Sequence, residues 1–119
     1  MNDCAVRGRW RGLELDALST GELERITEPV IALDADGRVV AMSAAAARWV
    51  GVAAWQAKGR ELSSEFGWRF GRSAVESIRS FVGASIPCLT IRAEPTAPRT
   101  ATSVALLRGD QRIYLAVAA

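Results

Sequence analysis

The acidic side chains are the residues of this 119-residue chain whose chemistry could support catalysis. The chain contains no histidine, which removes the commonest general base and the commonest protein ligand of haem and zinc. Glu61 and Glu65 are four residues apart, so a helix would place both carboxylates on one face. A solvated helix edge explains this pair equally well, and the other acidic residues lie in polar stretches. The spacing does not meet the geometric requirements of a catalytic site, and the sequence predicts no enzyme.

Asp34 and Asp36 form the acidic pair that could hold a metal ion. Two carboxylates without further oxygen or nitrogen ligands make a poor metal site. The pair lies between two apolar runs within residues 29–43, and Gly37 follows it. Aspartate side chains accept hydrogen bonds from nearby backbone N–H groups, and glycine adopts the positive φ of a hairpin turn. The stretch therefore predicts a β-hairpin and no metal site.

Charge, cysteine content and hydropathy restrict the setting in which the protein works. Cys4 and Cys88 form no motif, and we expect both to be reduced in a cytoplasmic protein. The N-terminus has no apolar signal core, and no apolar run reaches the roughly 20 residues that span a bilayer. The net charge of +2 is too small to indicate nucleic-acid binding. The sequence therefore predicts no membrane and no direct nucleic-acid partner.

The first 28 residues are expected to form an arm followed by an amphipathic helix. Ser19 and Glu22 have the spacing of a capping box, and the helix that follows ends before Pro29. Its apolar side must pack on a sheet of this chain or on a partner. We therefore divide the chain into an arm with an amphipathic helix at 1–28 and a folded domain at 29–119.

The rest of the chain predicts helices and then three strands. Alanines favour a helix over 44–50, and apolar residues recur at every third and fourth position over 72–84. The last third alternates between apolar and polar residues as strands do, over 87–92, 99–108 and 111–118. The order β-β-α-α-α-β-β-β predicts an α+β domain, in which helices cover one face of a five-stranded antiparallel sheet.

The stretch that contains the hairpin resembles PAS domains, the cytoplasmic sensor modules of bacterial signalling proteins. The family pattern is an apolar strand, Asp-x-x-Gly, a second strand, a small-residue helix that ends in an apolar residue and Gly, and a second Gly eight residues later. These elements are here VIALD, the turn to Gly37, RVVAM, AAAARWV with Gly51, and Gly59. Ser43 stands where the family usually has Asn, and either residue caps a helix.

The resemblance also allows the cofactor chemistries of the family to be tested on this chain. Light-sensing flavin members carry a reactive cysteine three residues after the second Gly, and Leu62 occupies that position here. A flavin–cysteine photoadduct is therefore not expected. Haem-binding members usually use a histidine on the long helix, which this chain lacks, so ordinary haem ligation is excluded. A flavin redox sensor stays open, and the sequence identifies no cofactor.

In such a fold the long helix lies across the sheet, and the side chains between them either surround a ligand or fill the core. Strand alternation, the long helix and the aromatic loop before it supply the candidate pocket residues Ile31, Leu33, Phe66, Trp68, Phe70, Ile78, Phe81, Leu89, Ile91, Val104 and Leu106. An aromatic wall of this kind suits a flat apolar ligand. The alternative is that these rings simply fill the core.

Two functions fit the resemblance. The first is a signal-sensing domain that binds a small apolar or aromatic ligand, or a protein partner, and modulates a homodimeric output in transcriptional or two-component signalling. The alternative is a ligand-free dimerisation or protein-interaction module. In both we expect the N-terminal helix to pack on the outer sheet face near Tyr114 and Ala116, and to help form a homodimer. The chain could be the N-terminal input domain of a longer protein.

Overall fold

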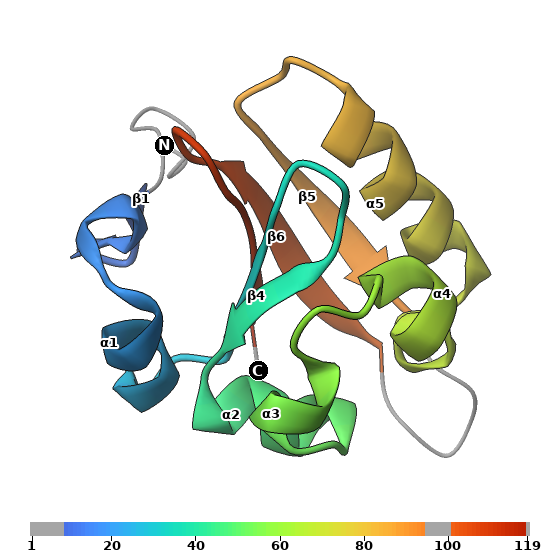
Figure 1. Cartoon of the computed structure of the whole chain (residues 1–119). Helices are drawn as coiled ribbons and strands as arrows, with labels where there is room; N and C mark the ends of the chain where they lie inside the picture. Colours follow the sequence, from blue (N-terminus) through green and yellow to red (C-terminus); the bar gives the residue numbers. More distant parts are fainter. Residues whose placement is uncertain (1–8, 95–100, 119) are drawn as a thin grey trace.

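A five-stranded antiparallel sheet forms the centre of the protein (Figure 1). The computed structural model describes residues 9–94 and 101–118. The strands lie in the order β4-β3-β7-β6-β5 and comprise β3 (Val30–Leu33), β4 (Val39–Met42), β5 (Cys88–Ala93), β6 (Thr102–Arg108) and β7 (Ile113–Ala118). Because β3 pairs with both β4 and β7, the first hairpin and the last three strands share one sheet. This arrangement confirms the predicted α+β architecture.

The β3–β4 hairpin is closed by the side chain of Asp34. Its Oδ1 accepts the backbone N–H groups of Asp36 at 2.9 Å and Arg38 at 3.0 Å. Gly37 has a φ of 81°, a conformation that side chains with a Cβ rarely adopt. The predicted turn role of Asp34 and Gly37 is confirmed.

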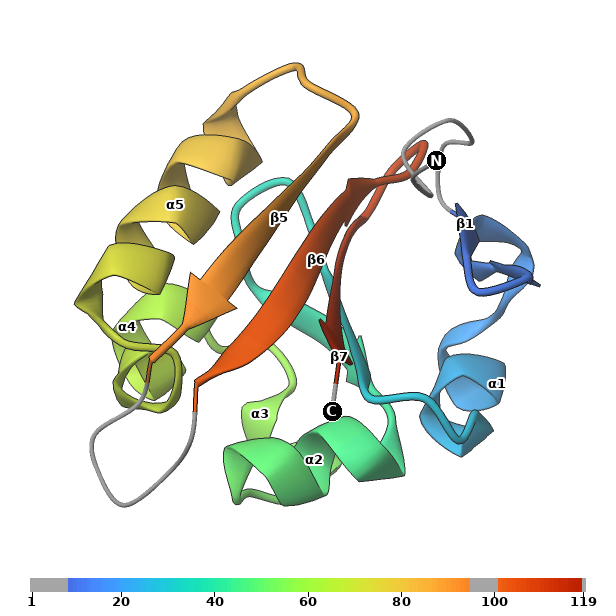
Figure 2. The same ribbon diagram turned by 180° about the vertical axis from the view of Figure 1, so that it is seen from behind.

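Helices cover one face of the sheet, which we call the inner face (Figure 2). They are α2 (Ala44–Val50), α3 (Ala54–Ala57), α4 (Leu62–Phe66), η3 (Gly67–Arg69, a 3₁₀ helix) and α5 (Arg72–Gly83). The helix predicted over 44–50 has these bounds, and it ends at Gly51, whose φ is 96°. The short turn expected around Trp55 is the helix α3. None of the helices in the described part of the chain is long and apolar enough to cross a membrane.

Ser43 joins the first hairpin to the helical layer. Its Oγ accepts the backbone N–H of Ala46 at 3.2 Å, which caps α2 as predicted. The same hydroxyl accepts the N–H of Val30 at 3.0 Å and donates to the carbonyl oxygen of Glu28 at 2.7 Å. Ser43 is fully buried, so this side chain satisfies three backbone groups that water cannot reach.

The N-terminal segment lies on the opposite face of the sheet, the outer face (Figure 1). It comprises β1 (Arg9–Trp10), β2 (Leu13–Glu14), η2 (Leu15–Ala17, a 3₁₀ helix) and α1 (Thr20–Arg25). The capping box of Ser19 and Glu22 is present as predicted. Before it, β1 and β2 form a short hairpin, in which the chain reverses at Arg11 and Gly12, which both have positive φ. The division at residue 28 stays a prediction.

The expected chemistry of the two cysteines requires a correction. Cys88 is disulfide-bonded, whereas the sequence predicted that both cysteines are reduced. The chain's other cysteine, Cys4, lies outside the described residues. Sequence spacing alone does not say which cysteines a fold brings within bonding distance.

Candidate functional site

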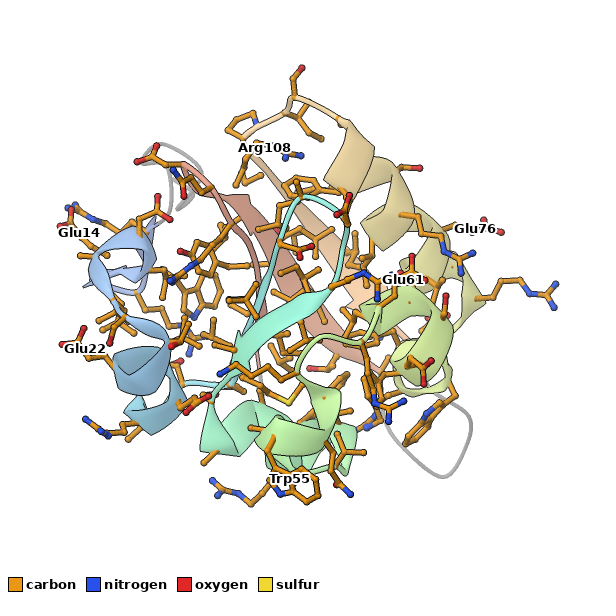
Figure 3. The ribbon with its side chains drawn as sticks, viewed as in Figure 1. Glu14, Glu22, Trp55, Glu61, Glu76 and Arg108 are labelled. Carbon is orange, nitrogen blue, oxygen red and sulfur yellow. The ribbon has the colours of Figure 1, made fainter. Side chains whose placement is uncertain are left out.

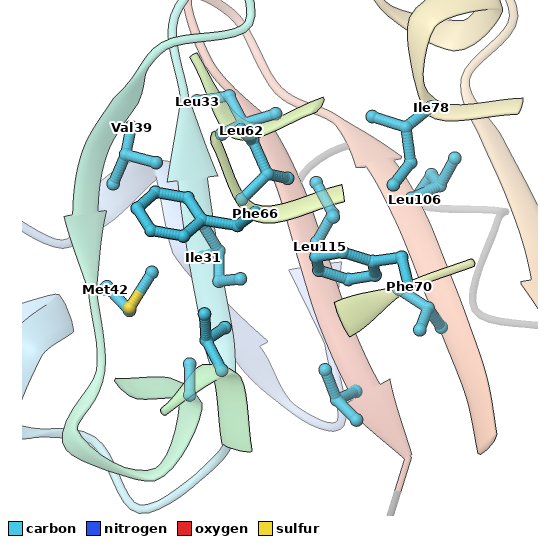
Figure 4. Packing of buried hydrophobic residues seen from close by; sticks show 14 of the residues in the cluster. Ile31, Leu33, Val39, Met42, Leu62, Phe66, Phe70, Ile78, Leu106 and Leu115 are labelled. Atoms are coloured by element: carbon cyan, nitrogen blue, oxygen red, sulfur yellow. The ribbon is translucent and has the colours of Figure 1, made fainter. Parts of the chain in front are cut away.

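The predicted ligand pocket lies between the inner sheet face and the helices, and side chains fill it. Most of the predicted pocket residues are at most 2% exposed: Ile31, Leu33, Phe70, Ile78, Phe81, Val104 and Leu106. They pack in one cluster with Val39, Met42, Leu62, Phe66 and Leu115, and we call it the inner cluster (Figure 4). Each strand contributes alternate residues to this cluster, as predicted for the inner face.

Two aromatic rings occupy the middle of this space. Phe66, at the end of α4, is 7% exposed, and Phe70, which follows η3, is fully buried. Figure 4 shows both rings among the side chains of the central strands. A ligand at this place would have to displace rings that the chain itself supplies. The geometry therefore supports the filled core over the open pocket.

Two predicted pocket residues lie elsewhere. Trp68 is 57% exposed on η3, so the expectation that its ring joins the pocket wall is wrong. Leu89 pairs with Leu106 and so shares its sheet face, but it is 37% exposed because β5 is an edge strand. Ile91 is half-buried and packs against the inner cluster. Side chains at the sheet's edge are covered less well than strand alternation predicts.

The hollows around the core open on the surface. One of about 370 Å³ lies between α5 and the β5 end of the sheet and is lined by Phe81 and Leu89. Another of about 470 Å³ is lined by Phe66 together with Trp55, whose ring is 77% exposed (Figure 3). These hollows touch the inner cluster from outside and do not lie within it.

Arg69 is a buried charged residue that the sequence did not single out. It is 6% exposed, and its Nε donates to the carbonyl oxygen of Trp49 at 2.5 Å. Its guanidinium also lies 3.8 Å from the centre of the Trp49 ring, which in turn stands 5.1 Å from the ring of Phe70. The carbonyl and the ring face stabilise a positive charge that has lost water. Arg69 thus fixes the end of α2 against η3.

The predicted acidic pair of α4 is held at the surface. Glu61 accepts a hydrogen bond from the hydroxyl of Ser64, and Glu65 lies 3.3 Å from Nη1 of Arg60. Figure 3 shows Glu61 on the outside of the helical layer. Both carboxylates therefore contact neighbouring side chains, Glu61 at the start of α4 and Glu65 within it.

The outer face is apolar, and the N-terminal segment covers it. The strands contribute both small and bulky side chains there: Val30, Ala32, Ala41, Ala105, Leu107, Tyr114 and Ala116. Trp10, Leu15 and Leu23 of the N-terminal segment are buried on this surface, together with Tyr114 of β7. The expected position of the N-terminal segment near Tyr114 and Ala116 is therefore found within a single chain.

A group of polar contacts fastens this segment to the β6–β7 hairpin, and we call it the polar clasp: Asp16, Asp110, Arg112 and Tyr114. The hydroxyl of Tyr114 donates to Oδ1 of Asp16 at 2.6 Å, and the N–H of Asp110 donates to Oδ2 at 2.9 Å. Nη1 of Arg112 donates to the carbonyl oxygen of Leu18 at 3.0 Å. Burial raises the pKa of the Tyr114 hydroxyl, and the hydrogen bond and charge of Asp16 raise it further, while Arg112 opposes them.

Nothing local in the sequence identifies the polar clasp. Asp16 and Tyr114 are 98 residues apart, and each lies in an unremarkable stretch. The capping box and the apolar side of α1 predicted that the N-terminal segment packs on a surface, but not which polar groups hold it.

Solved structures of PAS domains share this architecture. The photoactive yellow protein domain from the sensor histidine kinase Ppr of Rhodospirillum centenum matches with a TM-score of 0.69 and 14% identity, over 96% of this chain and 100% of that one. The PAS domain of an HTR-like protein from Haloarcula marismortui matches with a TM-score of 0.57 and 21% identity, over 81% and 84%. The PAS domain of the quorum-sensing receptor RpfR from Cronobacter turicensis, solved with BDSF, matches with a TM-score of 0.56 and 9% identity, over 78% of this chain and 93% of that one.

Comparison by sequence adds nothing to these matches: no protein-family model matches the chain, and no curated protein matches it. The evidence is therefore three-dimensional and concerns the fold. Identities of 9–21% establish the shared fold and leave activity open. The chain has the PAS-domain fold, as the spacing of its first hairpin predicted.

Proposed function

We propose that this chain is a sensory or regulatory domain that responds to a protein partner through the outer sheet face. The PAS fold supports a role in signalling, since structures of this fold come from a sensor histidine kinase and a quorum-sensing receptor. The observation that carries the proposal is the polar clasp. It ties a short N-terminal segment to the end of the sheet across 98 residues of sequence.

The docked segment closes an apolar surface by a small number of contacts. Trp10, Leu15 and Leu23 are buried there, further apolar side chains of the segment are partly buried, and the clasp adds polar contacts, while four of the strand residues beneath are alanines. In the proposed mechanism, a signal releases or retains this segment. Two copies that exchange their N-terminal segments would each bury the same side chains on the partner's sheet, which gives the expected homodimer at little energetic penalty.

The oligomeric state of a clasp variant tests this proposal. Asp16→Ala removes the acceptor for Tyr114 and for the Asp110 N–H, so we expect a larger dimer fraction in light scattering across a concentration series. Asp36→Ala is the matched control, because it removes the same charge from an exposed hairpin turn. If the Asp16→Ala chain stays monomeric at high concentration, and the Asp36→Ala chain does so too, the homodimer is contradicted.

The second candidate is the sensor that binds a small apolar or aromatic ligand in its interior. The RpfR structure favours it, since that PAS domain was solved with BDSF. The buried Phe66 and Phe70 weigh against it here. A thermal-shift screen against flavins, haem, fatty acids and aromatic acids separates the two, because a ligand bound only by the folded state raises the melting temperature. We expect no stabilisation, and a rise that Phe70→Leu alters would replace the partner model by the ligand model.

A cytoplasmic location and a transcriptional or two-component output complete the proposal, and no catalytic step is part of it. The disulfide of Cys88 weighs against a strictly reducing location, because such bonds are rare in reducing compartments. Thiol titration of freshly lysed cells, with and without reductant, checks this point. Free thiols before reduction support the cytoplasmic assignment.

A further inference from the structure

The two edges of the sheet differ in whether their backbone groups are free to pair with another strand. At the β4 edge, the loop after α3 adds backbone hydrogen bonds to the strand. The N–H of Val39 donates to the carbonyl of Arg60 at 2.9 Å, and the N–H of Gly59 donates to the carbonyl of Val39 at 2.8 Å. The N–H of Leu62 donates to the carbonyl of Gly37 at 3.0 Å. This edge is therefore closed to another strand.

The β5 edge is open at Thr90 and Arg92, while just past the strand the N–H of Glu94 donates to the carbonyl of Phe70 at 2.9 Å. The N–H of Arg108 donates to the carbonyl of Pro87, and antiparallel register then turns every second residue of β5 toward β6. Thr90 and Arg92 therefore direct their N–H and C=O groups away from the sheet. Both residues are exposed, and among the described residues their outward backbone groups meet no partner. β5 contains no proline, lysine or bulge of the kind that usually protects an edge.

A groove runs beside this open edge on the inner side of the sheet. It has a volume of about 370 Å³ and lies between α5 and β5. Ser73, Ser77 and Ser80 form its helical wall, and these short side chains leave the space open. Ile86 and Leu89 line its other side and are 44% and 37% exposed. An extended chain paired with β5 would direct alternate side chains into this groove.

The charges along the groove indicate which kind of peptide would bind there. Glu76 is exposed and lines the groove, and Figure 3 shows its carboxylate pointing to solvent. The neighbouring charges of Arg92 and Glu94 are 3.4 Å apart and neutralise one another. The groove has a mixed lining of serine and apolar side chains. Arg108 lies beside Phe81 and Ile86, since its guanidinium is 4.6 Å from the centre of the Phe81 ring and its Nε donates to the carbonyl of Ile86 at 2.9 Å. Glu76 is the carboxylate on the helical wall, and a basic side chain placed next to it complements this charge.

We propose that the β5 edge binds an extended peptide segment of a partner protein by strand addition, with apolar residues at alternate positions and one basic residue facing Glu76. This inference is independent of the polar clasp, which lies on the outer face. A second copy of the chain fits less well. The β5 side chains on the groove side are Leu89, Ile91 and Ala93, so a second β5 brings no basic group to Glu76.

Two synthetic octapeptides test the proposal on the full chain. In both, valine alternates with threonine and both ends are blocked. The terminal valine is replaced by lysine in one peptide and by glutamate in the other. Titration of the isotope-labelled chain, followed by amide NMR shifts, should perturb Thr90 and Arg92 first. We expect the lysine peptide to bind about threefold more tightly than the glutamate peptide. Glu76→Gln should remove this difference.

Further variants separate strand addition from adhesion to an apolar patch. N-methylation of the alternate peptide residues whose N–H groups face β5 should abolish binding, because it removes the hydrogen-bond donors to the strand. Leu89→Ser should weaken binding about tenfold, since it removes an apolar contact without touching the core. Trp55→Ser, at an exposed aromatic residue away from the groove, is the matched control and should change nothing.

Four results would overturn the proposal, and three of them concern the peptides. They are the absence of binding at millimolar peptide, binding that survives N-methylation in both phases, and shifts that map outside β5 and α5. A fourth is an increase of mass with concentration in the peptide-free chain, accompanied by shifts at Thr90 and Arg92. That result would assign the edge to a second copy.

Discussion

The two faces of the sheet are closed in opposite ways. On the inner face, α4, α5 and Phe70 supply bulky side chains that pack against those of the strands, and Phe70, Ile78 and Leu106 are almost fully buried. On the outer face, four of the strand residues are alanines, and one short segment buries Trp10, Leu15 and Leu23 on them and on Tyr114. Residues of the same strands build both surfaces, because alternate side chains point to opposite faces.

This difference separates stability from responsiveness. Interlocked side chains have few alternative arrangements, so the inner face resists change as a unit. The outer face is covered by one short segment, whose docking depends on a few large side chains and on the polar clasp. Regions with few buried contacts open at lower free energy than the core. The outer face is therefore the part of the molecule that a signal could move without unfolding the rest.

The largest expected effect is on the inner face. Phe70→Ala removes a ring that is fully buried between the sheet and the helices. We expect the free energy of unfolding to fall by about 3–5 kcal/mol, measured by urea denaturation, because the cavity cannot collapse in a tightly packed core. A loss below about 1 kcal/mol would mean that the interior has room for a ligand after all.

The outer face should respond locally to the loss of a large side chain. Leu23→Ala removes the buried residue of α1, which is fully covered in the docked segment. We expect a loss of about 2–3 kcal/mol, confined to the docking of the N-terminal segment. Limited proteolysis should cut before residue 30 while the sheet survives. Thr27→Ala, at an exposed position of the same segment, is the control and should leave the cleavage rate nearly unchanged.

A smaller effect is expected from the polar clasp. Tyr114→Phe removes the hydroxyl that donates to Asp16, which should reduce the free energy of docking by about 1–2 kcal/mol. Hydrogen exchange of the α1 amides measures this loss. An unchanged exchange rate would mean that the apolar contacts alone hold the segment.

The pH dependence of the clasp follows from the raised pKa of Tyr114. The folded state keeps this proton above pH 10, the ordinary value at which the unfolded chain releases it. Stability is therefore full below pH 10 and falls as the pH rises above it. Tyr114 is the only tyrosine in the chain, so tyrosinate absorbance reports its ionisation directly. Tyr114→Phe should remove this alkaline loss, and a normal titration near pH 10 in the folded protein would contradict the buried clasp.

The smallest effect is expected at Trp68. Its ring is 57% exposed, so Trp68→Ala should change stability by less than about 0.5 kcal/mol. Phe70 lies two residues further along the chain. The difference between the stability losses of Trp68→Ala and Phe70→Ala shows where the inner cluster ends. A loss comparable to that of Phe70→Ala would return Trp68 to the core.

Local chemistry predicted the elements of the fold, and long-range geometry decided the candidate site. Asp34 and Ser43 act on backbone groups a few residues away, so their roles could be inferred from spacing. Trp68 was misplaced because the direction of a side chain on one turn of 3₁₀ helix depends on how that turn packs. Asp16 meets Tyr114 only because the N-terminal segment folds over the last strand, which no local pattern encodes.

Native-state hydrogen exchange tests most directly whether the outer face opens independently. It compares the amide of Leu23, bonded within α1, with that of Leu106 in the middle of the sheet. We predict that the Leu23 amide exchanges through an opening at least about 2 kcal/mol below global unfolding, while the Leu106 amide exchanges only when the whole chain unfolds. Equal opening free energies at both amides would contradict this account, because the two faces would then form a single cooperative unit.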